Sequence, residues 1–113
     1  MAALGVDILT IGLAATAPIA QFQPVQATGA PATAAGNAVG FARIAAATGE
    51  RCPVTVEGTA IAIAGAAIAL GALVEVHTTV TQVVTKSAGV SIGRALNAAA
   101  AAGDQVEVLI LPN

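Results

Sequence analysis

The chain carries few side chains that could perform chemistry, and its single histidine, His77, is the first of them to consider. A Ser–His–acid triad would need His77 together with Ser87 or Ser91 and a carboxylate. His77 lies in the alternating run Glu75-Val76-His77-Thr78, where a half-exposed histidine on a strand needs no catalytic role. One histidine and one cysteine cannot supply the four ligands of a zinc site within the chain. The sequence therefore predicts no catalytic residue, no metal ligand and no cofactor-binding residue.

The carboxylates and the cysteine have structural explanations. Glu50 and Asp104 each follow a glycine, a pairing typical of turns. Cys52 precedes Pro53 and has no histidine partner nearby, which favours a small buried apolar residue over a nucleophile. The carboxylates of the predicted strands are expected to point outward; they are Glu57, Glu75 and Glu107. We therefore expect a protein that is not an enzyme.

Composition argues against several other classes of function. The 113 residues carry a net charge of −2 and their basic residues are scattered, so nucleic-acid binding is not expected. The longest apolar window, Ala60 to Val74, is shorter than the roughly 20 residues of a membrane-spanning helix, so no membrane contact is expected. Charged residues make up only 9% of the chain, against roughly 25% in typical soluble domains. Such a surface is expected to be covered in part by another protein.

Two segments of the chain are similar to each other. Residues 39–56 read VGFARIAAATGERCPVTV, and residues 91–112 read SIGRALNAAAAAGDQVEVLILP. The alignment places these residues in pairs: Ile19 with Ile68, Val25 with Val74, Gly40 with Gly93, Ala42 with Ala95, Gly49-Glu50 with Gly103-Asp104, and Val54 with Val108. Arg43 and Arg94 fall near equivalent places. A repeat of this kind predicts two similar units fused in tandem.

The pattern within each unit is that of strands. Apolar and polar residues alternate with period two, and Gly/Pro turns recur at roughly ten-residue spacing. The alanine runs 45–47 and 98–102 are too short for stable helices. The predicted fold is all-β: a small barrel or sandwich of two tandem, similar β units with little or no helix. Residues 17–113 are expected to form a single β domain, with repeat units at about 17–58 and 66–112.

Two local features leave open how the strands are placed. Residues 1–16 are apolar and predict a short strand within Ile8–Leu13. This segment is either the first strand of the domain or an extended arm that adds a strand to a neighbouring subunit. Pro53 has no N–H to donate, so its strand is expected to begin after it or to lie on an edge.

The C-terminal part of the chain resembles the small bacteriophage capsid cement (head decoration) proteins. In that family the last third typically has an apolar residue, Gly, a variable residue, Ala-Leu, an alanine- or serine-rich linker, Gly-Asp and an alternating final strand. The matching residues here are Ile92, Gly93, Ala95, Leu96, Gly103, Asp104, Val106 and Val108. The resemblance covers residues 17–111 or so, whereas the N-terminal segment is longer and more apolar than the family pattern.

The resemblance implies a non-enzymatic structural protein of the virion. Such a protein binds the major capsid protein on the outer surface of the capsid as a homo-oligomer, a trimer first and a dimer as the alternative. It stabilises contacts between capsomers and needs no cofactor. The residues expected at the capsid or subunit interface are Leu4, Val6, Ile8, Leu9, Ile11, Arg43 and Arg94.

Two other classes of function compete with this interpretation. A self-assembling component of a phage tail, fibre or shell would share the same composition. A sugar-binding β domain is disfavoured, because sugar rings usually stack on Trp or Tyr and the chain has neither.

Overall fold

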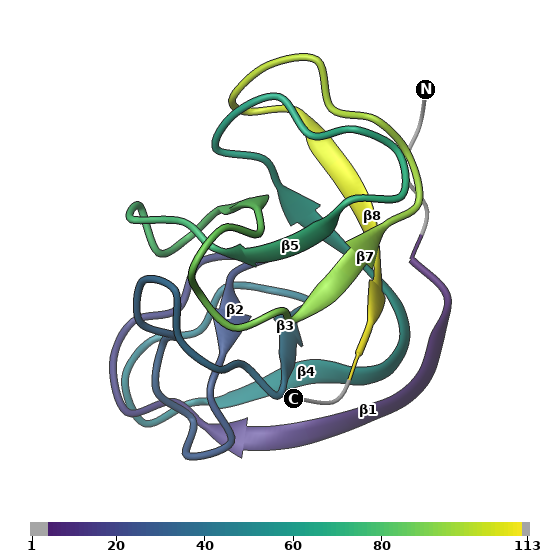
Figure 1. Ribbon diagram of the computed structural model, residues 1–113. Coiled ribbons are helices and arrows are strands. Elements are labelled where there is room, and N and C mark those ends of the chain that lie inside the picture. The colour runs from purple at the N-terminus through teal and green to yellow at the C-terminus, as the bar shows by residue number, and fades with distance from the viewer. Residues whose placement is uncertain (1–4, 112–113) are drawn as a thin grey trace.

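The computed structural model describes residues 5–111, and within this range it contains strands but no helix (Figure 1). The strands are β1 (Asp7–Ala14), β2 (Pro24–Val25), β3 (Gly40–Ala42), β4 (Arg51–Ile63), β5 (Leu73–Val76), β6 (Val83–Thr85), β7 (Gly93–Ala95) and β8 (Gln105–Ile110). The prediction of an all-β fold is confirmed. The alanine runs lie in turns and short bridges, as their length predicts. No helix able to cross a membrane is present in residues 5–111.

The strands form one nearly closed antiparallel sheet. Its order is β2-β3-β4-β8-β7-β5-β6, with β1 paired to β4 beside this path. An isolated bridge between Ala64 and Val83 joins the end of β4 to β6 and brings the sheet close to a small barrel. β4 belongs to two lobes. Its first part pairs with β1 and β3 in the N-terminal lobe, and residues 59–63 pair with β8 in the C-terminal lobe, which also holds β5, β6 and β7.

Gly58 stands where β4 passes from the N-terminal lobe to the C-terminal lobe. Its φ of 95° lies in the left-handed region that glycine adopts without steric cost. A Cβ atom at this position would lie 2.2 Å from the carbonyl oxygen of Val6. Glycine therefore allows the backbone of β1 to approach β4 closely at this point.

Pro53 lies inside β4, so the prediction that its strand begins after it or lies on an edge is wrong. β4 begins at Arg51 and pairs with β1 on one side and β3 on the other. The backbone N–H of Arg43 donates to the Pro53 carbonyl at 2.9 Å. Proline cannot return this bond. The Nε2 of Gln21 donates to the Arg43 carbonyl instead, at 3.2 Å, so the missing donor is supplied by a side chain.

Each lobe has its own apolar core, and the two cores correspond residue by residue. The smaller cluster, in the N-terminal lobe, is made of Ala15, Ile19, Val25, Ala42, Ala46, Cys52 and Val54. The corresponding members of the larger cluster are Ala64, Ile68, Val74, Ala95, Ala99, Val106 and Val108. The larger cluster also contains Phe41, which comes from the opposite side of β3. The core is thus built mainly from small aliphatic side chains, as the composition requires.

The turns of the two lobes are also alike. Gly49 and Gly103 have φ angles of 89° and 92°. The Glu50 carboxylate accepts a hydrogen bond from the Ala47 N–H at 2.7 Å, and the Asp104 carboxylate accepts one from the Ala100 N–H at 3.0 Å. The turn role expected of both acids is confirmed. The division of a single domain into repeat units at 17–58 and 66–112 stays a prediction.

Candidate docking surface

β1 is an edge strand that exposes large aliphatic side chains. It pairs with β4 alone among the described strands, so its other edge has no strand beside it (Figure 1). Val6, just before β1, is 60% exposed; within the strand, Ile8 is 73% exposed and Leu9 is 45% exposed. Natural proteins usually protect an exposed edge with lysine, proline or a covering segment, because an open edge accepts further strands. β1, DILTIGLA, contains neither lysine nor proline.

The N-terminal end of β1 is held firmly to its own chain. The Val6 N–H donates to the Thr59 hydroxyl at 2.8 Å, and the Thr59 N–H donates to the Val6 carbonyl at 2.9 Å. Asp7 accepts a hydrogen bond from the hydroxyl of Thr55 at 2.8 Å. The pairing with β4 is irregular between Asp7, Leu9 and Thr10. These contacts hold the start of β1 against β4.

The residues predicted for the interface do not all share one environment. Leu4 lies outside the described residues. Ile11 is half-buried against the smaller core, so it supports β1 from beneath. Arg43 forms an ion pair with Asp7 at 3.0 Å, while the Nη1 of Arg94 donates to the Gly71 carbonyl at 2.7 Å. The strand pairing makes Phe41, and not Arg43, the counterpart of Arg94 in the N-terminal lobe. Phe41 pairs with Pro24 there, just as Arg94 pairs with Leu73 in the C-terminal lobe.

The sequence did not single out Leu109, an exposed apolar residue on the outer side of the C-terminal lobe. Leu109 lies directly opposite Thr59 on β4 and Arg94 on β7, and Arg94 lies opposite Leu73 on β5. Directly paired residues project from the same side of a sheet. Leu109 is 37% exposed, whereas Thr55, its counterpart on the N-terminal lobe, is 1% exposed. The signal was present in β8, where Leu109 continues the outward positions of Gln105 and Glu107.

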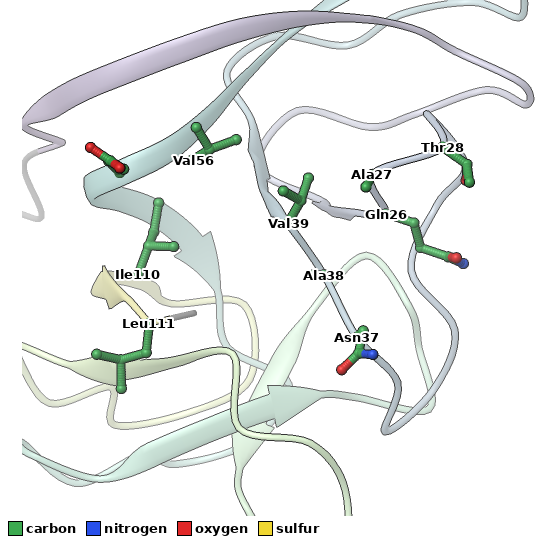
Figure 2. Close-up of a pocket in the computed structure, with 10 residues that line it drawn as sticks. Gln26, Ala27, Thr28, Asn37, Ala38, Val39, Val56, Ile110 and Leu111 are labelled. Atoms are coloured by element: carbon green, nitrogen blue, oxygen red, sulfur yellow. The ribbon is translucent and has the colours of Figure 1, made fainter. Parts of the chain in front are cut away.

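A groove of about 510 Å³ lies between the N-terminal lobe and the end of β8 (Figure 2). Its apolar wall is formed by Val39, Val56, Ile110 and Leu111. Its polar rim is formed by Gln26, Thr28, Asn37 and Glu57. The aliphatic side chains of Val56 and Ile110 lie next to each other at one end, and Asn37 and Gln26 lie toward the other (Figure 2).

Glu75 departs from the prediction that the strand carboxylates point outward. It is buried, and its carboxylate accepts hydrogen bonds from the N–H groups of Ser87 and Gly89. The segment after β6 folds back over β5, which buries the acid and satisfies it with backbone donors. The expectation for Glu75 is therefore wrong, and Glu75 holds the 86–89 turn in place.

The other candidate groups for chemistry are held in structural roles. The Nδ1 of His77 accepts a hydrogen bond from the Thr79 N–H at 3.0 Å. Cys52 is fully buried, as predicted, and its burial raises the pKa of the thiol. Residues 5–111 bring together no group of three histidine, cysteine or acidic residues that could hold a metal ion.

A family model described as phage cement protein matches residues 5–110. The chain belongs to the phage cement protein family. The resemblance inferred from the sequence is thereby confirmed, and the protein is a structural component of the phage virion. No curated protein matches the chain.

The fold of this family member is shared with a solved phage structure. The crystal structure of the head fiber gp8.5 N base in bacteriophage phi29 superposes with a TM-score of 0.72 at 15% sequence identity. The match covers 91% of this chain and 93% of that chain. At this identity the likeness shows a common fold, in a protein whose description places it at a phage head.

Proposed function

We propose that this protein binds the outer surface of a phage capsid, through the major capsid protein, and stabilises the contacts between capsomers. The observation that carries the proposal is the open edge of β1 with Val6, Ile8 and Leu9 exposed beside it. Its membership of the cement family supports the same conclusion. The protein acts in this role without catalysis.

The mechanism follows from the chemistry of a strand edge. A segment of the capsid protein that lies along β1 can pair with its unused backbone groups, while the exposed aliphatic side chains provide apolar contact. Burial of apolar surface contributes about 25 cal/mol per Å². β1 is itself bonded to β4, so force on the attached segment passes into the body of the domain. This is the property required of a brace between capsomers.

Several weak contacts act together if the protein binds as an oligomer, a trimer first and a dimer as the alternative. Linked contacts raise the apparent affinity by about 10²–10⁴ when the geometry allows all of them at once. The low charge of the chain fits a surface partly covered in an assembly.

The test is co-sedimentation with undecorated, expanded capsids. Ile8→Lys places a charge on the exposed edge, and we expect it to reduce capsid binding at least tenfold while leaving the unfolding midpoint within a few degrees. Leu70→Lys is the matched control, because Leu70 is 68% exposed but lies in a turn away from β1. Equal binding by the two variants would show that β1 is not the docking edge.

A second candidate is a self-assembling component of a fibre, tail or shell. The fold shared with a head fiber base favours it. Such a protein would form large assemblies alone and would not pellet with capsids. The same co-sedimentation, run with and without capsids, separates the two functions.

A further inference from the structure

The C-terminal lobe shows how the counterpart of the groove is filled. The turn at residues 33–36 of the N-terminal lobe reaches across to it. The Ala35 N–H donates to the Val76 carbonyl at 2.9 Å, and the Val90 N–H donates to the Ala35 carbonyl at 3.0 Å. Gly89 lies so close that a Cβ there would be 2.6 Å from the Cβ of Ala35. The two lobes are thus joined by a turn that inserts between two backbone segments.

We call the site that the inserted turn occupies in the C-terminal lobe a socket. The strand pairs show that the N-terminal lobe has an equivalent socket. Val25 pairs with Gly40 as Val74 pairs with Gly93. When residues are counted from these pairs along each chain segment, Ala27 is equivalent to Val76, and Asn37 is equivalent to Val90. The corresponding apolar residues are Val39 for Ile92 and Val56 for Ile110. These N-terminal residues line the groove of Figure 2.

The socket of the N-terminal lobe is open. Within residues 5–111 no hydrogen bond uses the carbonyl of Ala27 or the N–H of Asn37. Val39 remains half-exposed, whereas its counterpart Ile92 is 1% exposed beneath the inserted turn. The groove therefore has the backbone groups and the apolar wall of a filled socket, without the turn that fills it.

The matching turn of the C-terminal lobe is exposed. The Lys86 N–H donates to the Leu73 carbonyl as the Ala32 N–H donates to the Pro24 carbonyl, so Lys86 corresponds to Ala32. Residues 87–89 therefore form the counterpart of the turn at residues 33–36 and are one residue shorter. Lys86 and Ala88 are exposed, and no hydrogen bond among the described residues uses the backbone of Ala88. Glu75 fixes this turn through Ser87 and Gly89.

We infer that the turn at residues 86–89 of one copy of the chain inserts into the groove of a second copy, with Ala88 bonded to Ala27 and Asn37. This contact between two molecules is similar to the contact that Ala35 makes within one molecule. Charge favours it, since Glu57 is exposed on the rim of the groove and Lys86 begins the turn. Neither of them forms an ion pair with the described residues. A contact between two different surfaces of this kind builds a closed oligomer when the rotation closes.

The experiment is a charge reversal read by mass in solution, without capsids, so its outcome is independent of capsid binding. We expect the unaltered chain to form a discrete oligomer, and Glu57→Lys and Lys86→Glu each to raise its dissociation constant about tenfold or more. The double variant Glu57→Lys with Lys86→Glu has the net charge of the original chain, and we expect it to recover association. A monomeric unaltered chain, or a double variant as weak as the single ones, would overturn the inference.

Cross-linking gives a second and independent measurement. Asn37→Cys with Ala88→Cys in one chain should form disulfides between copies on mild oxidation, because the two residues are hydrogen-bonded neighbours in the inferred contact. Each single variant is the control and should not cross-link, since Cys52 is buried. Cross-linking of Asn37→Cys alone would instead place two grooves face to face and would contradict the insertion of the turn.

Discussion

The guanidinium of Arg43 lies 3.0 Å from the carboxylate of Asp7 and ties the start of β1 to the residue that follows β3. The other oxygen of Asp7 accepts a hydrogen bond from Thr55, whose side chain is buried in the middle of β4. One carboxylate therefore joins three segments of the N-terminal lobe. Its two partners differ in exposure, and this difference decides which of them matters for stability.

Removing Asp7 should cost more stability than removing Arg43. The side chain of Arg43 is 54% exposed, and exposed ion pairs contribute about 0–1 kcal/mol. Asp7→Ala also leaves the Thr55 hydroxyl buried without its partner, which costs about 1–3 kcal/mol. Chemical denaturation of Asp7→Ala and Arg43→Ala measures both free energies of unfolding. Equal losses in the two variants would show that the bond to Thr55 contributes nothing.

The strand content of the chain could be predicted from local patterns. Val54, Val106 and Val108 alternate with polar residues, and Gly49 and Gly103 mark turns that need a positive φ. These features act within a few residues of the chain, so the sequence displays them directly. The placement of Pro53 was missed because its compensation comes from Gln21, which is distant in sequence.

The candidate docking surfaces could be predicted only in part. The exposed residues at and just before the start of β1 were found because no polar alternation explains Val6, Ile8 and Leu9 together. The burial of Thr55 was not predictable, because alternation shows which residues share a face but not which face is covered. The groove likewise depends on where the turn at residues 33–36 docks, a tertiary contact without a local signature.

Gly58→Ala should weaken the attachment of β1. A Cβ at this position meets the Val6 carbonyl and also the Ile8 backbone nitrogen at 2.9 Å, on top of the cost of a positive φ. The backbone strain alone costs about 1–3 kcal/mol. Gly71→Ala is the matched control, because Gly71 has a φ of 86° and a Cβ there would meet no other part of the chain within 4 Å.

We expect Gly58→Ala to be the less stable of the two variants, with faster amide hydrogen exchange in β1 than in the Gly71→Ala variant. Exchange that is equally slow along β1 in both variants would show that the close approach of β1 to β4 does not depend on Gly58.

Cys52 should make stability fall with rising pH in the alkaline range. Burial raises the pKa of its thiol in the folded chain, whereas the unfolded chain releases the proton near the ordinary value of about 8.5. Above that pH the unfolded state binds fewer protons than the folded state, so the free energy of unfolding decreases. Below it the contribution is fully present.

The control for this pH dependence is Cys52→Val, which places at this position the residue found at the equivalent Val106. Denaturation of the unaltered chain and of Cys52→Val from about pH 7 to about pH 10 compares the two slopes. We expect the difference in free energy of unfolding between them to shift steadily in favour of Cys52→Val above about pH 8.5. Parallel curves would show that the thiol is as easily ionised in the folded chain as in the unfolded one.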